Sequence, residues 1–272
     1  LVKEFRLTLV RLCKLAILLL VLPFNAKLAQ ATEPYELTFA VNTPGSFPYL
    51  YYDNPSQTYK GLVPEFFAAL KRRELLDVTF VDSNQQRSET FAKEGKVDLY
   101  LANLGWVSEP SKVITSIPII QHKTFLYSLT PFDDDFDFAS VENKRVCTQL
   151  GYAYTGLQAS FEAGKLLRFE SSTQDTLGLM LAKGRCDYAV LNNYNAKLIF
   201  SAPEYCGLTI HQSPKPTSTV PLTIVMRPAL HKVKALIDEE LTGFITSGKA
   251  TQSLASHSSI PRFPMPGQCN SV

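Results

Sequence analysis

The chain has 272 residues, of which 27 are Lys or Arg and 25 are Asp or Glu, so its formal charge at pH 7 is only +2. With 45% apolar and 19% charged residues it has an ordinary globular composition, which excludes a disordered chain, a collagen and a disulfide-dense miniprotein. A charge this small gives no reason to expect a nucleic-acid partner. The length suits one large domain or two small ones.

The first 31 residues have the three parts of a secretory signal peptide. Basic residues between Lys3 and Lys14 precede an uncharged stretch at residues 15–26, and Ala29-Gln30-Ala31 forms a small-x-small cleavage site. The uncharged stretch is short for a bilayer span, which needs about 20 residues, although a permanent N-terminal anchor is the alternative. We expect cleavage near Ala31 and export of the mature chain to the periplasm.

The cysteines of the exported part form an even set: Cys147, Cys186, Cys206 and Cys269. An even set in an exported protein is typical of disulfides, and the sequence leaves every pairing open. Free buried thiols are the alternative. The spacings contain no CxxC pair and no metal-binding interval between histidines or cysteines, so we expect neither a metal nor a cofactor.

Residues 36–102 predict the order strand, helix, strand, helix, strand. The helix after Gly61 has apolar residues at the i, i+3, i+4 and i+7 positions, and Pro64 suits its first turn. Strands are expected at residues 36–41, 78–81 and 97–102, and the second helix at residues 85–94. This order is typical of a parallel sheet covered by helices.

The same order returns in the second half of the chain. Strands are expected at residues 145–149, 166–169 and 188–191, with helices at residues 154–164 and 175–183. Residues 95–103 and 184–192 also align: both read Gly, basic, apolar, Asp, four apolar or aromatic residues, Asn. Coincidence is the alternative, but the matching element order favours two lobes of one α/β design.

The remaining segments complete two lobes. Extended apolar runs at residues 123–129 and 220–226 are expected to cross between the lobes, and a long helix at residues 229–246 should return to the first one. A short helix reaching Ser256 follows, and the proline-rich residues 261–267 should lie along the surface. The expected organisation is a signal peptide (1–31), lobe 1 (32–128), lobe 2 (129–220) and a return to lobe 1 (221–272).

Amide and aromatic side chains gather where predicted strands end. In open parallel sheets, ligands bind outside the carboxyl ends of the strands. Three amides follow such ends, and aromatic residues follow two of the same strands: Asn42, Asn103 and Asn192, with Phe47, Tyr49 and Trp106. Asn is also a common turn residue, which is the simpler explanation for any single one. Taken together they predict a solute pocket with aromatic walls and a few polar groups.

The ordered motifs resemble those of the family 3 extracellular solute-binding proteins, the type II periplasmic binding proteins of amino-acid ABC transporters. The matching elements are Phe47-Pro48, Gly61 with Glu65, Gly95 with Asp98, Ser116-Ile117-Pro118, Gln149-Leu150-Gly151, and Gly184-Arg185 with Asp187. The resemblance covers nearly all of residues 36–257. It implies two lobes that close over a solute, and it adds Gly105, Gly151 and Tyr152 to the expected ligand-binding residues.

The chain departs from this family where the ligand's charges would be bound. Family members hold the α-carboxylate with a Thr and an Arg, and the corresponding residues here are Val107 and Pro110. Ser108 or Lys112 could replace them only if the loop were shifted. The family's Asp for the α-ammonium corresponds to the neutral Asn192. We therefore predict an atypical solute or a degenerate site.

Three functions are compatible with this sequence. We favour a monomeric periplasmic protein that binds a small polar solute, with an ABC permease as its membrane partner and without catalytic activity. A sensory module that presents the solute to a membrane receptor is one alternative, and a lyase-type periplasmic enzyme on the same scaffold is another. No catalytic motif of the GxSxG or HExxH type occurs, and the acidic residues 133–137 lack the Gly and Glu of a calcium loop.

Overall fold

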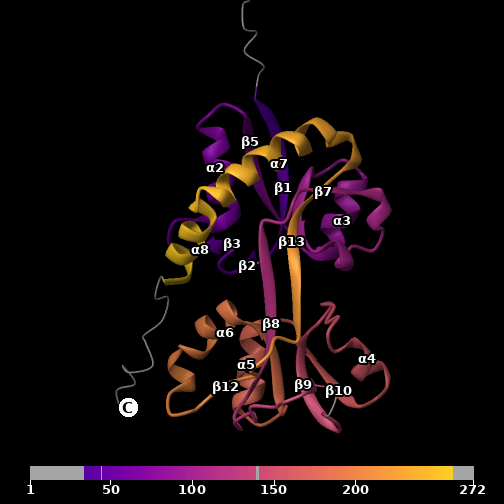
Figure 1. Cartoon of the computed structure of the whole chain (residues 1–272), viewed down its shortest axis with the longest axis vertical. Helices are drawn as coiled ribbons and strands as arrows, with labels where there is room; N and C mark the ends of the chain where they lie inside the picture. The colour runs from indigo at the N-terminus through magenta and orange to yellow at the C-terminus, as the bar shows by residue number, and fades with distance from the viewer. Residues whose placement is uncertain (1–33, 44, 139–140, 260–272) are drawn as a thin grey trace, which may run out of the picture. The chain divides into compact units, whose positions relative to one another are not determined.

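A computed structural model describes residues 34–43, 45–138 and 141–259, which belong to one compact unit beginning at Pro34 (Figure 1). The predicted signal peptide, its cleavage site, Cys269 and the proline-rich tail lie outside the described residues. Among the helices of the described part, none is both long enough and apolar enough to cross a membrane.

The first half of the chain forms the predicted parallel sheet. Strand β1 (Tyr35–Asn42) lies between β5 (Leu76–Ser83) and β6 (Leu99–Ala102) and is parallel to both. The connecting helices are α2 (Leu62–Lys71) and α3 (Gln85–Lys93), so the predicted element order is confirmed. The apolar stripe of α2 is buried in the larger hydrophobic core, as its i, i+3, i+4, i+7 spacing predicts.

A small antiparallel sheet between β1 and α2 was not predicted. It consists of β2 (Gly45–Ser46), β3 (Leu50–Asp53) and β4 (Thr58–Lys60), which are too short to give an alternating pattern. Its backbone supports the start of α2, because Leu62 N–H donates to Pro48 O and Val63 N–H donates to Tyr49 O. A Cβ at Gly61 would lie 2.6 Å from Pro48 O, and its φ is 120°, so this position requires glycine.

The second half repeats the parallel arrangement. Strand β9 (Lys144–Gln149) lies between β10 (Leu166–Ser171) and β11 (Tyr188–Asn192), and α5 (Gln174–Ala182) connects the last two. Helix α4 (Gln158–Glu162) is shorter than the predicted helix at residues 154–164. The segment before it is a loop, in which Gly156 packs so closely that a Cβ would lie 1.7 Å from Thr217 O. Helix α6 (Asn193–Phe200) was not predicted.

Two long antiparallel strands connect the halves: β8 (Ile120–Ser128) and β13 (Ser218–Met226) (Figure 1). The first half of β13 pairs with β8 and its second half pairs with β6, while β8 also pairs with β11. The result is one sheet with the order β10-β9-β11-β8-β13-β6-β1-β5. The predicted two-lobed, mainly parallel α/β fold is confirmed. The lobe boundaries at residues 128 and 220 stay predictions.

The short strands β7 (Ile114–Thr115) and β12 (His211–Gln212) pair with β13 and β8, respectively. After β13, helix α7 (His231–Thr246) buries Val233, Ile237, Leu241 and Phe244 in the same core as α2. Helix α8 (Lys249–Ser259) then packs beside α2 and α7 (Figure 1). The C-terminal helices thus complete the core of the first sheet.

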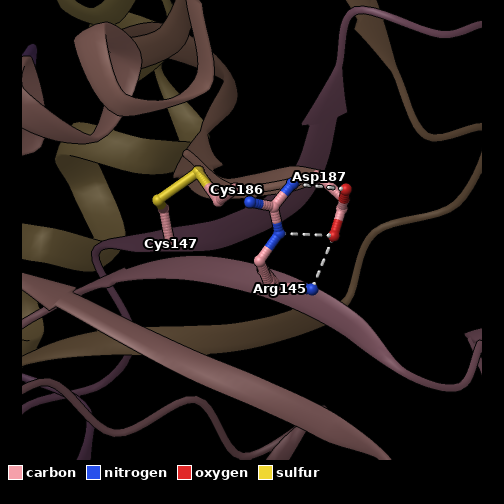
Figure 2. The surroundings of a disulfide bond; sticks show 4 residues. All are labelled: Arg145, Cys147, Cys186 and Asp187. Atoms are coloured by element: carbon pink, nitrogen blue, oxygen red, sulfur yellow. Dashed lines mark hydrogen bonds and ion pairs between the residues drawn. A yellow bond between two sulfur atoms is a disulfide. The ribbon is translucent and has the colours of Figure 1, made fainter. Parts of the chain in front are cut away.

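A disulfide between Cys147 in β9 and Cys186 before β11 ties two neighbouring parallel strands together. Figure 2 shows the adjacent Arg145–Asp187 ion pair, in which the Asp187 carboxylate accepts hydrogen bonds from both the guanidinium and the backbone N–H of Arg145. Cys206 is also disulfide-bonded. Disulfides are thus present, and this pairing is one that the sequence alone left open.

Candidate functional site

A cavity of about 150 Å³ lies at the ends of the parallel strands, where both halves of the chain meet β8 and β13. Its wall includes residues from β1, β6, β8, β11 and β13, the first turns of α3 and α5, and the loop at residues 151–154. No Lys, Arg, Asp or Glu side chain is among the described residues of this wall. The cavity is therefore polar through neutral groups only.

Part of the predicted set of ligand-binding residues comes together in this wall: Asn42, Trp106, Gly151, Tyr152 and Asn192. Asn42 belongs to the first half of the chain and Tyr152 to the second. The amide Nδ2 of Asn42 donates a hydrogen bond to the Tyr152 hydroxyl at 3.0 Å. A direct polar contact therefore joins the two halves at the cavity wall.

Contacts of Arg168 and Tyr154 hold the loop that carries Tyr152 in place. Arg168 donates to the backbone oxygen of Tyr152 at 3.0 Å, and its guanidinium lies over the rings of Tyr154 and Phe161. The hydroxyl of Tyr154 accepts a hydrogen bond from the Gln149 backbone N–H at 2.8 Å. Burial raises the pKa of the Tyr152 hydroxyl, which consequently stays protonated.

The predicted amides at the other two strand ends act as helix caps. Asn103 accepts from Gly105 N–H and donates to the carbonyl of Pro221, which uses both ends of its amide. Asn192 accepts from the N–H groups of Tyr194 and Asn195 at the start of α6. Asn103 lies outside the cavity wall, whereas Asn192 lines it.

The other predicted residues lie elsewhere. Tyr49 is fully buried in the core behind the cavity, where its ring meets those of His122 and Tyr194 edge-on. Phe47 is buried against Tyr51, and Gly105 sits in the exposed turn after β6. Neither these residues nor Asn103 appear in the wall of the cavity.

His122, which lines the cavity from β8, is one of the wall residues that sequence reasoning missed. Its side chain is 9% exposed, and its Nδ1 has no hydrogen-bond partner among the described residues. Burial lowers the pKa of the imidazole to about 4, so the ring is neutral near pH 7. The hydroxyl of Tyr100, in the same wall, is likewise buried without a partner. A single His in an apolar strand gives no sequence signal of such a role.

The positions that would hold an α-carboxylate in the resembled family do not reach the cavity. Val107 is buried in a small core and Pro110 is exposed. Ser108 donates through its backbone N–H to the buried carboxylate of Glu89, and Lys112 pairs with Glu109. The loop therefore supplies no cation to the cavity. In the described part of the chain, no cluster of His, Cys, Asp or Glu could hold a metal ion.

No family model matches the chain, and no curated protein matches it in sequence. Solved structures do share its fold. An ArgBP from T. maritima has a TM-score of 0.65 and 17% identity, over 83% of this chain and 96% of that one. The GluR0 ligand-binding core, solved with L-glutamate, has a TM-score of 0.68 and 14% identity, over 84% and 100%.

A histidine kinase sensor domain with similarity to periplasmic binding proteins is equally similar, with a TM-score of 0.66 and 15% identity over 84% of this chain and 96% of that one. These likenesses identify the fold as that of the two-lobed periplasmic binding proteins. At such low identity they carry no information about what this chain binds.

Proposed function

We propose that the chain is a periplasmic protein that captures a small polar solute between its lobes and delivers it to an ABC permease. The observation that carries this proposal is the cavity itself, whose wall is supplied by both halves of the chain and includes the bonded pair Asn42 and Tyr152. A structural neighbour described as the substrate binding protein of an amino acid ABC transporter supports a binding role.

Hinge closure is the mechanism that this arrangement favours. A solute that contacts both lobes interacts more strongly with the closed state than with the open one, and it shifts the equilibrium by that difference in affinity. The strands β8 and β13 are the connections between the lobes, so bending is expected there.

Export supports the same proposal. The N-terminal segment has the pattern of a signal peptide, and the Cys147–Cys186 disulfide is a bond that persists in oxidising compartments. Periplasmic location and solute capture are therefore proposed together.

A sensory role is the second candidate, because one structural neighbour is a histidine kinase sensor domain. In that case the solute-bound form would associate with a membrane receptor instead of a permease. Co-purification of the bound chain with either partner from native membranes would separate the two roles.

We propose binding without catalysis. The titratable groups of the described cavity wall are His122 and tyrosines, and a base whose pKa is about 4 is poorly matched to proton transfer near pH 7. Among the described residues of the wall there is no carboxylic acid that could assist His122.

The direct test is a thermal-shift screen of the exported chain against amino acids, peptides, polyamines, organic acids, sugars and aromatic metabolites. A ligand at 100 times its Kd stabilises the folded state by about 2.7 kcal/mol, which raises the melting temperature by several degrees. A clear shift with one solute class supports the proposal. No shift with any member of the panel would contradict it.

A further inference from the structure

We propose that the solute is uncharged, with apolar surface on one side and a hydrogen-bonding group on the other, and that His122, Tyr100 and Asn192 recognise that group. This inference rests on the proposed function and names the class of ligand that the cavity takes.

The cavity provides no charge compensation for a bound ion. The described wall of the cavity contains no Lys, Arg, Asp or Glu, and the loop positions that could have supplied a cation are occupied by Val107 and Pro110. An ion moved from water into such a cavity loses its hydration and meets no opposite charge. An α-amino acid would bring two such ions.

The helices that begin at the cavity already carry caps at their N-termini. A free helix N-terminus can hold an anion through its N–H groups. Here α3, α5 and α6 each carry a cap of their own: Asn84 accepts from Arg87 N–H, Thr173 from Thr176 N–H, and Asn192 from Tyr194 and Asn195 N–H. At each of these helix starts an oxygen of the protein already accepts from at least one of the N–H groups that a ligand carboxylate would use.

Two residues of the wall carry neutral polar groups without hydrogen-bond partners. Nδ1 of His122 and the hydroxyl of Tyr100 are buried and have no hydrogen-bond partner among the described residues. Buried polar groups are nearly always paired in folded proteins. Five buried side-chain atoms of the described residues lack a partner, and these two are the ones that belong to residues of the cavity wall, so we infer that a bound molecule supplies their missing bonds when the lobes close around it. A neutral amide or hydroxyl can do so without the cost of burying an ion.

The rest of the wall fits the apolar side of such a solute. Trp106, Leu101, Val190 and Leu222 contribute apolar surface to the same cavity. Apolar walls with a few placed polar groups are the usual composition of a small-molecule site.

A charge series on one ring tests the inference. Benzamide, benzoate, benzylamine and phenylalanine are titrated by calorimetry into the exported, purified chain. We expect benzamide to bind at least tenfold more tightly than any of the three charged compounds. Equal or tighter binding of a charged compound would overturn the inference, and so would a lack of binding by all four.

Failure of the inference about charge and failure of the proposed function give different results. If a charged solute from the wider screen binds tightly, the chain is still a solute-binding protein and only the inference about charge fails. If neither the series nor the wider screen yields a ligand, the proposed function itself fails.

Two variants test the residues. Tyr100→Phe removes only a hydroxyl that has no partner, so we expect an unchanged or higher melting temperature together with at least fivefold weaker benzamide binding. Tyr205→Phe, at a buried tyrosine outside the cavity wall, is the matched control and should leave benzamide binding unchanged. Unchanged benzamide affinity in Tyr100→Phe would remove Tyr100 from the site and contradict the inference.

The second variant is Asn192→Asp, which keeps an oxygen for the α6 cap and adds a negative charge to the wall. We expect it to raise the affinity for benzylamine relative to benzamide at least tenfold. A selectivity that does not change would show that the solute does not approach Asn192, and would contradict the assigned recognition.

Discussion

The indole ring of Trp106 meets the imidazole ring of His122 edge-on, with their centroids 5.8 Å apart and their planes at 90°. Tyr49 meets the same imidazole from another direction, also at 5.8 Å. Trp106 therefore lines the cavity and also fixes the orientation of His122. A substitution at Trp106 therefore changes both the cavity wall and the orientation of the His122 imidazole.

Trp106→Ala should abolish measurable solute binding while leaving the protein folded. The side chain packs against the main core but is only partly buried, so its truncation should cost less stability than that of a fully buried aromatic residue. The measurement is calorimetric titration of the solute found in the screen, with circular dichroism to verify folding. Phe169→Ala, which truncates an exposed aromatic residue in β10, is the control, and unchanged affinity in Trp106→Ala would refute the site.

Asn192→Ala should also abolish binding, but this variant changes the stability of α6 as well as the cavity wall. The amide caps α6 and lines the cavity, so its removal costs about 1 kcal/mol of cap energy in addition to any ligand contact. Denaturant unfolding should reveal that smaller stability loss. Binding retained by Asn192→Ala would remove this residue from the site, whatever the change in stability.

Acid should destabilise the protein through His122. Burial lowers the pKa of this imidazole in the folded state from 6.5 to about 4, so the unfolded chain binds more protons between these values. Stability is complete above pH 6.5 and is lost as the pH falls toward 4, by about 3 kcal/mol in total. The rings of Tyr49 and Trp106, which face His122, do not change charge in this range.

The test is the free energy of unfolding of wild type and of His122→Gln as a function of pH. The difference between the two proteins should shrink as the pH falls, since Gln does not titrate. His231→Gln, at an exposed position at the start of α7, should follow the wild-type curve. Parallel curves for wild type and His122→Gln would contradict a buried neutral histidine.

Asp98 and Asp187 show what the sequence could predict. Each follows a glycine with positive φ that ends a helix, Gly95 or Gly184, and each accepts a backbone N–H from the neighbouring parallel strand. Each also binds an arginine, Arg227 for Asp98 and Arg145 for Asp187. In both aligned motifs, an Asp carboxylate therefore attaches the turn after a helix to the neighbouring strand. A repeated motif of this kind can be recognised in the sequence.

The candidate site was less predictable from the sequence, because residues of the same type make different contacts in the folded chain. Asn103 and Asn192 follow equivalent strands, yet one amide is used up within the protein and the other lines the cavity. The role of His122 depends on burial beside Trp106 and on the lack of a partner for Nδ1. Those conditions arise only when distant segments of the chain pack together.

Removing the carboxylate of Asp98 should destabilise the first sheet. Asp98→Ala leaves the Thr38 N–H and the Arg227 guanidinium without their acceptor, which should cost about 1–3 kcal/mol in denaturant unfolding. Asp98→Asn keeps an oxygen for Thr38 N–H and should cost less. Equal stability of Asp98→Ala and wild type would show that this anchor does not contribute.

Loss of the Cys147–Cys186 disulfide should lower stability without changing the ligand site. The bond closes a segment with a sequence separation of 39 residues, for which chain entropy predicts about 4 kcal/mol. The double variant Cys147→Ala/Cys186→Ala isolates this bond, whereas a reductant would also open the disulfide of Cys206. We expect a lower denaturation midpoint and an unchanged solute Kd at 25 °C, and an unchanged midpoint would contradict the argument.

Tyr152→Phe should weaken closure of the two lobes. The variant deletes the acceptor of the Asn42 amide but keeps the ring, the loop and the Arg168 contact to the backbone oxygen. The contact between the two halves loses a hydrogen bond of about 1 kcal/mol, so we expect solute affinity to fall about fivefold and the melting temperature of the solute-free protein to fall by no more than a few degrees. Small-angle scattering at subsaturating solute should then report a larger open fraction than for wild type. Tyr188→Phe, a change outside the cavity wall, should leave both measurements unaltered. If Tyr152→Phe binds and closes like wild type, the contact between Asn42 and Tyr152 plays no part in capture.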